Sequence, residues 1–575
     1  MYTSRFTVVL LAAAVVIASC GKKAPSYTQY IPKDASYVVA LDIKGMMTKL
    51  EKDSLSMENM LQVLKENKDQ STYNTALEYW KQFQNAGLDF ENKLLVAIPA
   101  LDLEKGEITA EVVAGLKDPK KLEEFIGKLP NSPKPVKEGN ISTITTPDFS
   151  LGYNNEAVVI LAKGGGTNQY SALDMEEADS NKVAPAPGAS NSTADLLKKY
   201  FGLKKEESIA SVEAATSVLA ENADIAVYTS SASLANAAGM GGGGMAMAFM
   251  PKVKELVEGI YSTSLINFED GKVDVKSNSF MGPKLSEILK KYAGPTVNMD
   301  LVNNYPSNNV NGIMAFSFKP ELIPGMLKEL GLDALANIAM AEAGTNLDEI
   351  AKAFKGEFAV IVSDFAINQV DMGKDAAYMR TEPSAKLVAA IKIGDKAAFD
   401  KLLAMGEKAG MLKREGNKLI PMDGGQAAPP SFGVVGIEGD VLVYSNDAQV
   451  YSGYAGKQAK LSLPGNAASA MSGKSVSGFV NVESILKGIP ETLFDSTDVH
   501  EKNILVRSRQ VFKSMQFNTG NFDGKKISGD AEILMESGKN SLPQLVRFLM
   551  YVAEEMKARD AQWEVQAVEE VELKP

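Results

Sequence analysis

Short apolar runs bounded by polar residues recur along the chain and predict β-strands. The runs at residues 37–44 and 312–319 are each followed by a Met- and Leu-rich segment that predicts a helix. The runs at 112–117 and 387–392 stand at the same offset of 275 residues, and each precedes an amphipathic helix. The helical spacing after the first of these runs is carried by Leu122, Phe125, Ile126 and Leu129. The two halves therefore repeat one order of predicted elements.

The repetition continues toward the end of each half. Residues 267–281 and 521–535 each predict a pair of strands around a glycine-containing turn, now at an offset of 254. Residues 283–289 and 543–549 predict helices that share a proline near the start and the same apolar spacing. The offset falls because residues 164–193 form an insertion, rich in Gly, Pro and Ser, that the second half lacks.

These matches predict two tandemly duplicated domains, at residues 31–295 and 308–558. Strands often follow one another without an intervening helix, so antiparallel pairing should dominate. We therefore predict an α+β fold in which helices pack on mainly antiparallel sheets. Chance similarity between two α+β segments is the alternative, because each match is short. Residues 559–575 are acidic and weakly patterned and predict a frayed tail.

Residues 1–19 have the features of a secretory signal. Arg5 precedes an apolar stretch that ends at Ile17, and small residues lead to Cys20, the only cysteine in the chain. The apolar stretch is short for a membrane span. The run at 17–21 resembles a bacterial lipoprotein signal, which implies that Cys20 is diacylated through its sulfur, for example with palmitate, and that residues 20–30 form a tether. An ordinary signal peptide or an uncleaved anchor is the alternative.

Composition excludes several kinds of chemistry. The 575 residues carry a formal net charge of −12, so neither nucleic acid nor anionic lipid is expected as the main partner. With Cys20 acylated, no thiol nucleophile remains, and a single histidine cannot form a multi-histidine zinc site. That histidine, His500, stands among charged and turn-forming residues, which predicts a solvated side chain. We predict no metal, no cofactor and no enzymatic activity.

Residues 239–250 form a Gly- and Met-rich segment that is the strongest candidate for a contact element. Its G-x-G-x-x-G spacing follows a predicted helix rather than a strand, so no dinucleotide site is expected. Methionine side chains fill irregular gaps and line adaptable binding surfaces, whereas coordination of a soft metal is the less favoured alternative. The predicted apolar contact loop comprises Met240, Met245, Met247, Phe249 and Met250.

Residues 468–475 satisfy a relaxed phosphate-loop pattern. A phosphate loop must follow a strand and open a helix, yet residues 476–482 have the pattern of a strand that comes afterwards. This segment therefore predicts a turn between a helix and a strand.

The segment after the tether reads Ile-Pro-Lys-Asp-Ala-Ser-Tyr-Val-Val at residues 31–39. With the signal before it and the strand-helix units after it, this opening resembles an uncharacterised family of Bacteroidetes envelope lipoproteins known only as a domain of unknown function. The resemblance covers most of the mature chain. It implies a lipid-anchored envelope protein and supplies no catalytic residue.

Two further expectations follow from the resemblance. Surface-exported lipoproteins of this phylum often carry acidic residues after the anchor, whereas Lys22 and Lys23 follow Cys20 here. An outer-membrane protein that faces the periplasm is therefore favoured over one on the cell surface. Ser54 and Ser496 each follow an aspartate, in triplets similar to the O-glycosylation sites of the same group, so both are candidate sites.

Three functions stay open at this point. A non-catalytic binding or scaffolding protein of the cell envelope, with a protein or glycan partner, is favoured. The first alternative is a carrier or chaperone that holds an apolar ligand. The second is a carboxylate-based glycan hydrolase, which needs neither histidine nor cysteine, although the sequence singles out no acidic pair.

Overall fold

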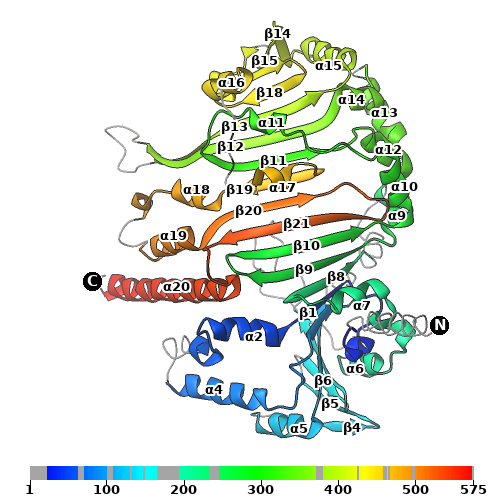
Figure 1. Cartoon of the computed structure of the whole chain (residues 1–575), viewed down its shortest axis with the longest axis vertical. Coiled ribbons are helices and arrows are strands. Elements are labelled where there is room, and N and C mark those ends of the chain that lie inside the picture. Colours follow the sequence, from blue (N-terminus) through cyan, green and yellow to red (C-terminus); the bar gives the residue numbers. More distant parts are fainter. Residues whose placement is uncertain are drawn as a thin grey trace, which may run out of the picture. The chain divides into compact units, whose positions relative to one another are not determined.

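The computed structural model shows two compact units (Figure 1). It describes residues 23–61, 70–99, 108–129, 133–146, 149–164, 193–231, 245–342, 344–370, 380–423, 426–457, 461, 463, 467–494 and 499–572. Unit 1 takes its residues from Met1–Met47, Asn74–Gly241 and Tyr261–Leu265. Unit 2 takes its residues from Thr48–Tyr73, Gly242–Ile260 and Ile266–Pro575. Both units combine helices with antiparallel sheet, which confirms the predicted α+β class.

Unit 1 contains an antiparallel sheet whose described strands pair in the order β8–β1–β2–β3–β7–β6–β5–β4. The strands are β1 (Tyr37–Leu41), β2 (Leu94–Ile98), β3 (Ile108–Gly115), β4 (Val136–Glu138), β5 (Ile141–Thr145), β6 (Phe149–Tyr153), β7 (Ala157–Gly164) and β8 (Ile225–Ser230). Its helical segments are η1 (Ser26–Tyr30), α5 (Pro119–Lys128), α6 (Thr193–Phe201), η2 (Lys205–Glu207), η3 (Ile209–Ser211) and α7 (Glu213–Leu219).

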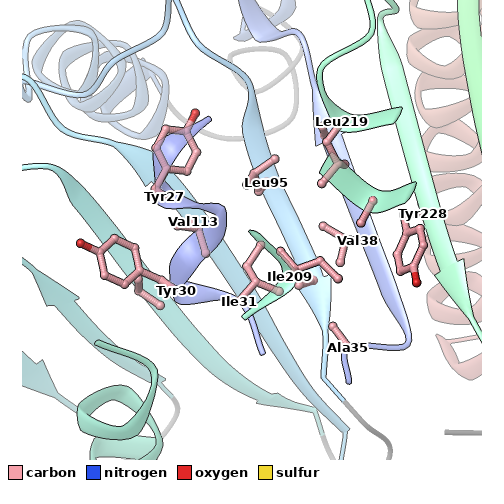
Figure 2. Packing of buried hydrophobic residues seen from close by; sticks show 14 of the residues in the cluster. Tyr27, Tyr30, Ile31, Ala35, Val38, Leu95, Val113, Ile209, Leu219 and Tyr228 are labelled. Atoms are coloured by element: carbon pink, nitrogen blue, oxygen red, sulfur yellow. The ribbon is translucent and has the colours of Figure 1, made fainter. Parts of the chain in front are cut away.

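The main core of unit 1 lies on one face of this sheet (Figure 2). Successive strand residues point to opposite faces, so Val38 is fully buried while its neighbour Tyr37 is 47% exposed. Tyr27 and Tyr30 from η1 and Ile209 from η3 pack over the buried face of the sheet. Helix α5 belongs to a second core cluster, for which Leu122 and Ile126 supply the buried side chains, as their spacing predicted.

Unit 2 contains a longer antiparallel sheet, in the described order β10–β21–β20–β19–β11–β12–β13–β18–β17–β15–β14, with β16 paired to β15. The strands are β10 (Lys272–Phe280), β11 (Val310–Ser317), β12 (Phe354–Val370), β13 (Arg380–Ile393), β14 (Leu412–Glu415), β15 (Lys418–Asp423), β16 (Gln426–Ala427), β17 (Val434–Glu438), β18 (Val441–Ser445), β19 (Val476–Val480), β20 (Phe512–Thr519) and β21 (Lys526–Met535). Strand β9 (Tyr261–Glu269) begins in unit 1 and ends in unit 2.

Helices accompany this sheet along its length. They are α9 (Met245–Val257), α10 (Pro283–Lys291), α11 (Asp300–Asn303), α12 (Leu322–Leu330), α13 (Asp333–Ala341), α14 (Leu347–Ala353), α15 (Lys396–Lys408), η4 (Pro430–Phe432), α16 (Ala448–Ala455), α17 (Ala467–Met471), α18 (Val482–Lys487), η5 (Glu491–Leu493), α19 (Val499–Val511) and α20 (Ser541–Glu572). Two more helices, α2 (Ile43–Lys52) and α4 (Gln70–Gln84), each carry residues of both units.

The core of unit 2 lies where α11, α16 and α17 pack on one face of the sheet. Tyr305 and Phe479 are its largest fully buried side chains. Helix α17 leads through a turn into β19, with Gly473 at a φ of 74°. This confirms the turn between helix and strand, which follows the end of α17 at Met471, because no helix begins where a phosphate loop would require one.

Helix α20 corrects the prediction of a frayed tail from residue 559. The helix continues without a break to Glu572. Residues 559–572 contain neither Gly nor Pro and are rich in Ala, Glu and Gln, which have high helix propensity. Propensity therefore outweighs the weak apolar pattern at this end.

Candidate functional site

A β-bulge in β12 is the most unusual backbone feature of unit 2. Its pairing register with β13 shifts between Ser363 and Ala366, and Asp364 within the bulge has a φ of 53°. A non-glycine residue in this conformation costs on the order of 1 kcal/mol or more and is kept only where the surroundings hold it. Bulges of this kind re-aim side chains and are frequent beside functional sites. Here the Asp364 amide donates to the carbonyl oxygen of Asn309, 3.1 Å away.

A chain of hydrogen bonds holds the Asp364 carboxylate. The Ser363 hydroxyl donates to Asp364 Oδ2 at 2.7 Å. The Tyr305 hydroxyl lies 2.7 Å from Ser363 Oγ and must be the donor, because serine has only one hydroxyl proton. Burial raises the pKa of Tyr305, so this phenol stays protonated. Asn309 Nδ2 completes the set by donating to Asp364 Oδ1 at 3.2 Å.

A second branch of the network connects β11 to α18. Ser484 Oγ donates to Asn309 Oδ1, and Asn311 Nδ2 donates to Ser484 Oγ, each at 3.0 Å. Asn311 is only 2% exposed, and its Oδ1 accepts from the backbone amide of Phe365 at 2.7 Å. Each amide group is thus held at both ends. Asn311 belongs to the buried end of the network and Asn309 to its exposed end.

Asn309, Phe365 and Ser484 of this network line a pocket of about 400 Å³ beside α18. Its lining includes Asn309, Phe365, Asn481, Glu483, Ser484 and Lys487. Asn481 caps α18, since its Oδ1 accepts from the Ser484 amide at 3.0 Å. Gly488 closes the pocket, and a β-carbon there would stand 2.2 Å from the carbonyl oxygen of Phe365. Only glycine fits this approach without a backbone shift.

The charged side chains at the pocket are paired with one another. Glu483 lies 2.9 Å from the Lys487 ammonium and 3.5 Å from that of Lys513. The hydrogen bond from Lys487 holds the pKa of Glu483 below its usual range, and Lys513 adds to this. Glu483 therefore stays ionised at neutral pH, whereas a general acid of a glycosidase requires a raised pKa. No cluster of metal-ligating side chains occurs among the described residues.

Unit 2 also has an apolar stripe on the sheet face opposite its core. On β11, Ile313 and Ala315 enter the core, so Met314 and Phe316 point to the other face. Met314 is 47% exposed. The ring of Phe316 stacks on that of Phe358 with centroids 4.8 Å apart. Phe318 also lies against Phe358, at 5.9 Å.

None of the singled-out residues that the structure describes lines the pocket. Cys20, Met240 and Ser496 lie outside the described residues. Met245, Met247, Phe249 and Met250 belong to α9, so this part of the segment is helical rather than a loop. The helix contacts α10 and α12, and Met250 is half-buried. Ser54 is exposed and has a φ of 59° in the turn after α2.

The prediction of a solvated His500 is wrong. Its Nδ1 lies 2.6 Å from Glu555 Oε2, and its side chain is only 17% exposed. Asn503 Nδ2 donates to the other oxygen of Glu555 at 3.1 Å. The residues adjacent to His500 in sequence predict solvent, but the packing of α19 against α20 supplies a carboxylate partner 55 positions away.

No local sequence pattern marks the network residues, because they are distant from one another along the chain. Asn311 and Ser484 are 173 positions apart, and nothing local marks either of them as part of a site. One local feature of the sequence does point to this region. Five asparagines occur between positions 303 and 311, just before and within β11, and asparagine is otherwise infrequent in strands.

The fold and the pocket define an α+β protein with a preorganised polar site. The chain belongs to the family described as Domain of unknown function (DUF4836), which matches residues 27–422. That range contains Asn309, Asn311 and Asp364 and ends before Ser484.

Other comparisons add little. A solved structure described as "Structure of crystal form I of TP0453" is similar over 46% of this chain and 81% of its own, with 9% identity and a TM-score of 0.23. A structural similarity this low supports no inference about the fold or function of this chain. No curated protein matches the chain. Within the described ranges, none of the helices has the length and apolarity needed to span a bilayer.

Proposed function

We propose that this protein is a lipid-anchored binding protein of the cell envelope that recognises its partner without chemically converting it. The observation that carries the proposal is the hydrogen-bonded network around the pocket in unit 2. Asn309, Asn311 and Ser484 are held in place by protein groups alone, which lowers the entropic cost of binding. The ionised Glu483 suits recognition better than proton donation.

The anchor is proposed from the sequence. Cys20 would be acylated after removal of residues 1–19, and Lys22 and Lys23 favour the periplasmic face of the outer membrane. We expect a Cys20→Ser variant to move from the membrane fraction to the soluble fraction of the cell envelope. Immunoblots of the two fractions check this, with lipid-labelled precursor as a second readout. A Cys20→Ser variant that stays membrane-bound would remove the lipid anchor from the proposal.

We also propose that the two halves are a duplication, over residues 31–295 and 308–558. The order of strand pairing supports it. Unit 1 pairs β8–β1–β2–β3–β7–β6, and unit 2 pairs β19–β11–β12–β13–β18–β17, so each half uses its successive strands in the same pattern. Helices α5 and α15 follow equivalent strands and are both capped by an aspartate, Asp118 and Asp395. Chance resemblance rarely reproduces pairing order and caps together.

In-cell crosslinking followed by mass spectrometry tests the binding function. The informative variant is Asn481→Asp, because aspartate caps a helix as well as asparagine but lacks the amide donor. The matched control is Asn346→Asp, which makes the same change at the cap of α14, away from the pocket. We expect a reproducible envelope partner that is lost in Asn481→Asp and kept in Asn346→Asp. Identical crosslinks in both variants would refute a role for the pocket.

A carrier of an apolar ligand is the second candidate, favoured by the apolar stripe on unit 2. Met314 is 47% exposed on a face that also carries the stacked rings of Phe316 and Phe358. Mass spectrometry of the purified protein should then detect co-purified lipid, and Met314→Glu should release it. Ligand-free protein would count against this function.

A further inference from the structure

The groups that face the pocket in unit 2 retain unused hydrogen-bonding capacity. Asn481 Oδ1 caps α18, while its Nδ2 has no partner among the described residues. Asn309 uses one of its two amide protons on Asp364, and Ser484 keeps one lone pair after its two bonds. The pocket wall therefore offers both unused donors and an unused acceptor.

The charges around the pocket are balanced. Two acidic side chains, Asp364 and Glu483, stand against two basic ones, Lys487 and Lys513. Each acidic group already has partners inside the protein. A charged ligand would have to compete with these internal pairs, whereas a neutral ligand leaves them intact.

One side of the pocket is apolar. Phe365 lines it, next to Gly488, which approaches the Phe365 backbone closely. The Ile367 amide donates to the Gly488 carbonyl at 2.9 Å, which ties the bulged strand to the end of α18. The aromatic residue therefore belongs to a rigid wall beside the fixed amides.

We infer that this pocket is a subsite for a neutral carbohydrate. A pyranose presents hydroxyl groups that both donate and accept, together with an apolar face of C–H bonds. These match the amide and hydroxyl groups and the aromatic residue of the pocket lining. The volume of about 400 Å³ lies at the small end of the range for ligand pockets, which suits a terminal sugar unit. The inference rests on the proposed binding function and names its ligand class.

Saturation-transfer NMR with neutral trisaccharides of glucose, galactose, mannose and N-acetylglucosamine tests the inference on the purified full-length protein. Glycerol 3-phosphate and glutamate, which both carry carbon-bound protons, serve as charged probes. We expect saturation transfer to at least one trisaccharide and none to the charged probes. Asn481→Asp should weaken binding about tenfold, the effect of losing one or two hydrogen bonds. Asn481→Ser, which keeps a cap without the amide or a new charge, should do the same.

The control Asn346→Asp should change affinity by less than about twofold. Absence of transfer to every trisaccharide, preference for a charged probe, or wild-type affinity in both Asn481 variants would overturn the carbohydrate assignment. The crosslinking experiment separates this failure from failure of the binding function. Loss of a crosslinked partner in Asn481→Asp without any saccharide binding would leave the binding function standing and reject the carbohydrate alone.

Discussion

Glu111 on β3 is a buried carboxyl group, and its substitution offers the sharpest test of how unit 1 is stabilised. The side chain is fully buried, and neither of its oxygens has a hydrogen-bond partner among the described residues. Its cross-strand neighbours are Ala97 on β2 and Leu161 on β7, both fully buried as well. Burial raises the pKa of Glu111 well above its usual range, so the folded protein keeps this carboxyl protonated.

The pH dependence follows from proton linkage. In the unfolded chain Glu111 ionises with a pKa of about 4.3, so unfolding above that pH releases a proton. The free energy of unfolding therefore falls by about 1.4 kcal/mol for each pH unit between the unfolded and the folded pKa. The contribution of the Glu111 carboxyl to the free energy of unfolding is therefore fully present at acidic pH and is lost as the pH rises.

Glu111→Gln removes the titration and keeps the shape of the side chain. The difference in unfolding free energy between wild type and Glu111→Gln should decline with the slope given above. Glu111→Leu also removes the buried polar group and should be more stable than wild type at pH 7, by about 1–3 kcal/mol. Burial raises the pKa of Tyr200, so this phenol stays neutral throughout this range.

Urea unfolding between pH 5 and pH 8 measures the effect. Trp80 in α4 reports on unit 1, provided that Trp563, the other tryptophan, is replaced by phenylalanine. Glu124→Gln, an exposed change on α5, is the control and should follow the wild-type profile. Parallel pH profiles for wild type and Glu111→Gln would mean that Glu111 is ionised or hydrated in the folded protein, and the reasoning would be refuted.

Two further predictions concern unit 2. Gly488→Ala should lower the free energy of unfolding by about 1–3 kcal/mol, because the new β-carbon would stand 2.2 Å from the Phe365 carbonyl oxygen. The control is Gly312→Ala, which should be tolerated because no atom would lie nearer than 3.6 Å to its new β-carbon. Equal stability of these variants in urea would show that the wall of the pocket adapts freely. Glu555→Leu should cost about 1–3 kcal/mol, since it leaves His500 and Asn503 partly buried without their acceptor. Hydrogen exchange in α19 should rise in that variant, and an unchanged rate would argue that the pair contributes nothing.

Local patterns were enough for most of the secondary structure. The spacing at Leu122 and Ile126 predicted α5 and its buried face, because one helical stripe must meet the core. The strand pattern at 476–482 predicted β19 and excluded a phosphate loop. Alternating and consecutive apolar runs predicted antiparallel sheets with packed helices. These features depend on neighbours within a few positions, which is the range over which a sequence can be interpreted directly.

The tertiary structure decided which polar side chains are buried and which partners they contact. Nothing near Glu111 in the sequence indicates that its carboxyl lies in a core, since β3 alternates like any half-buried strand. His500 gained a carboxylate partner only through the packing of α19 on α20. The last residues of α20 are helical because their intrinsic helix propensity is high, although their apolar pattern is weak.

The candidate site depends on long-range contacts even more. The residues around it come from β11, from the bulge in β12 and from α18, and Asn309 and Ser484 are 175 positions apart. Aspartate tolerates a positive φ better than most residues, but the partners that meet Asp364 come from other parts of the chain. The sequence by itself determined the elements, the class of fold and the lack of a second cysteine or histidine. The folded chain decided which polar groups meet, because hydrogen bonds join atoms that are close in space, whatever their distance along the chain.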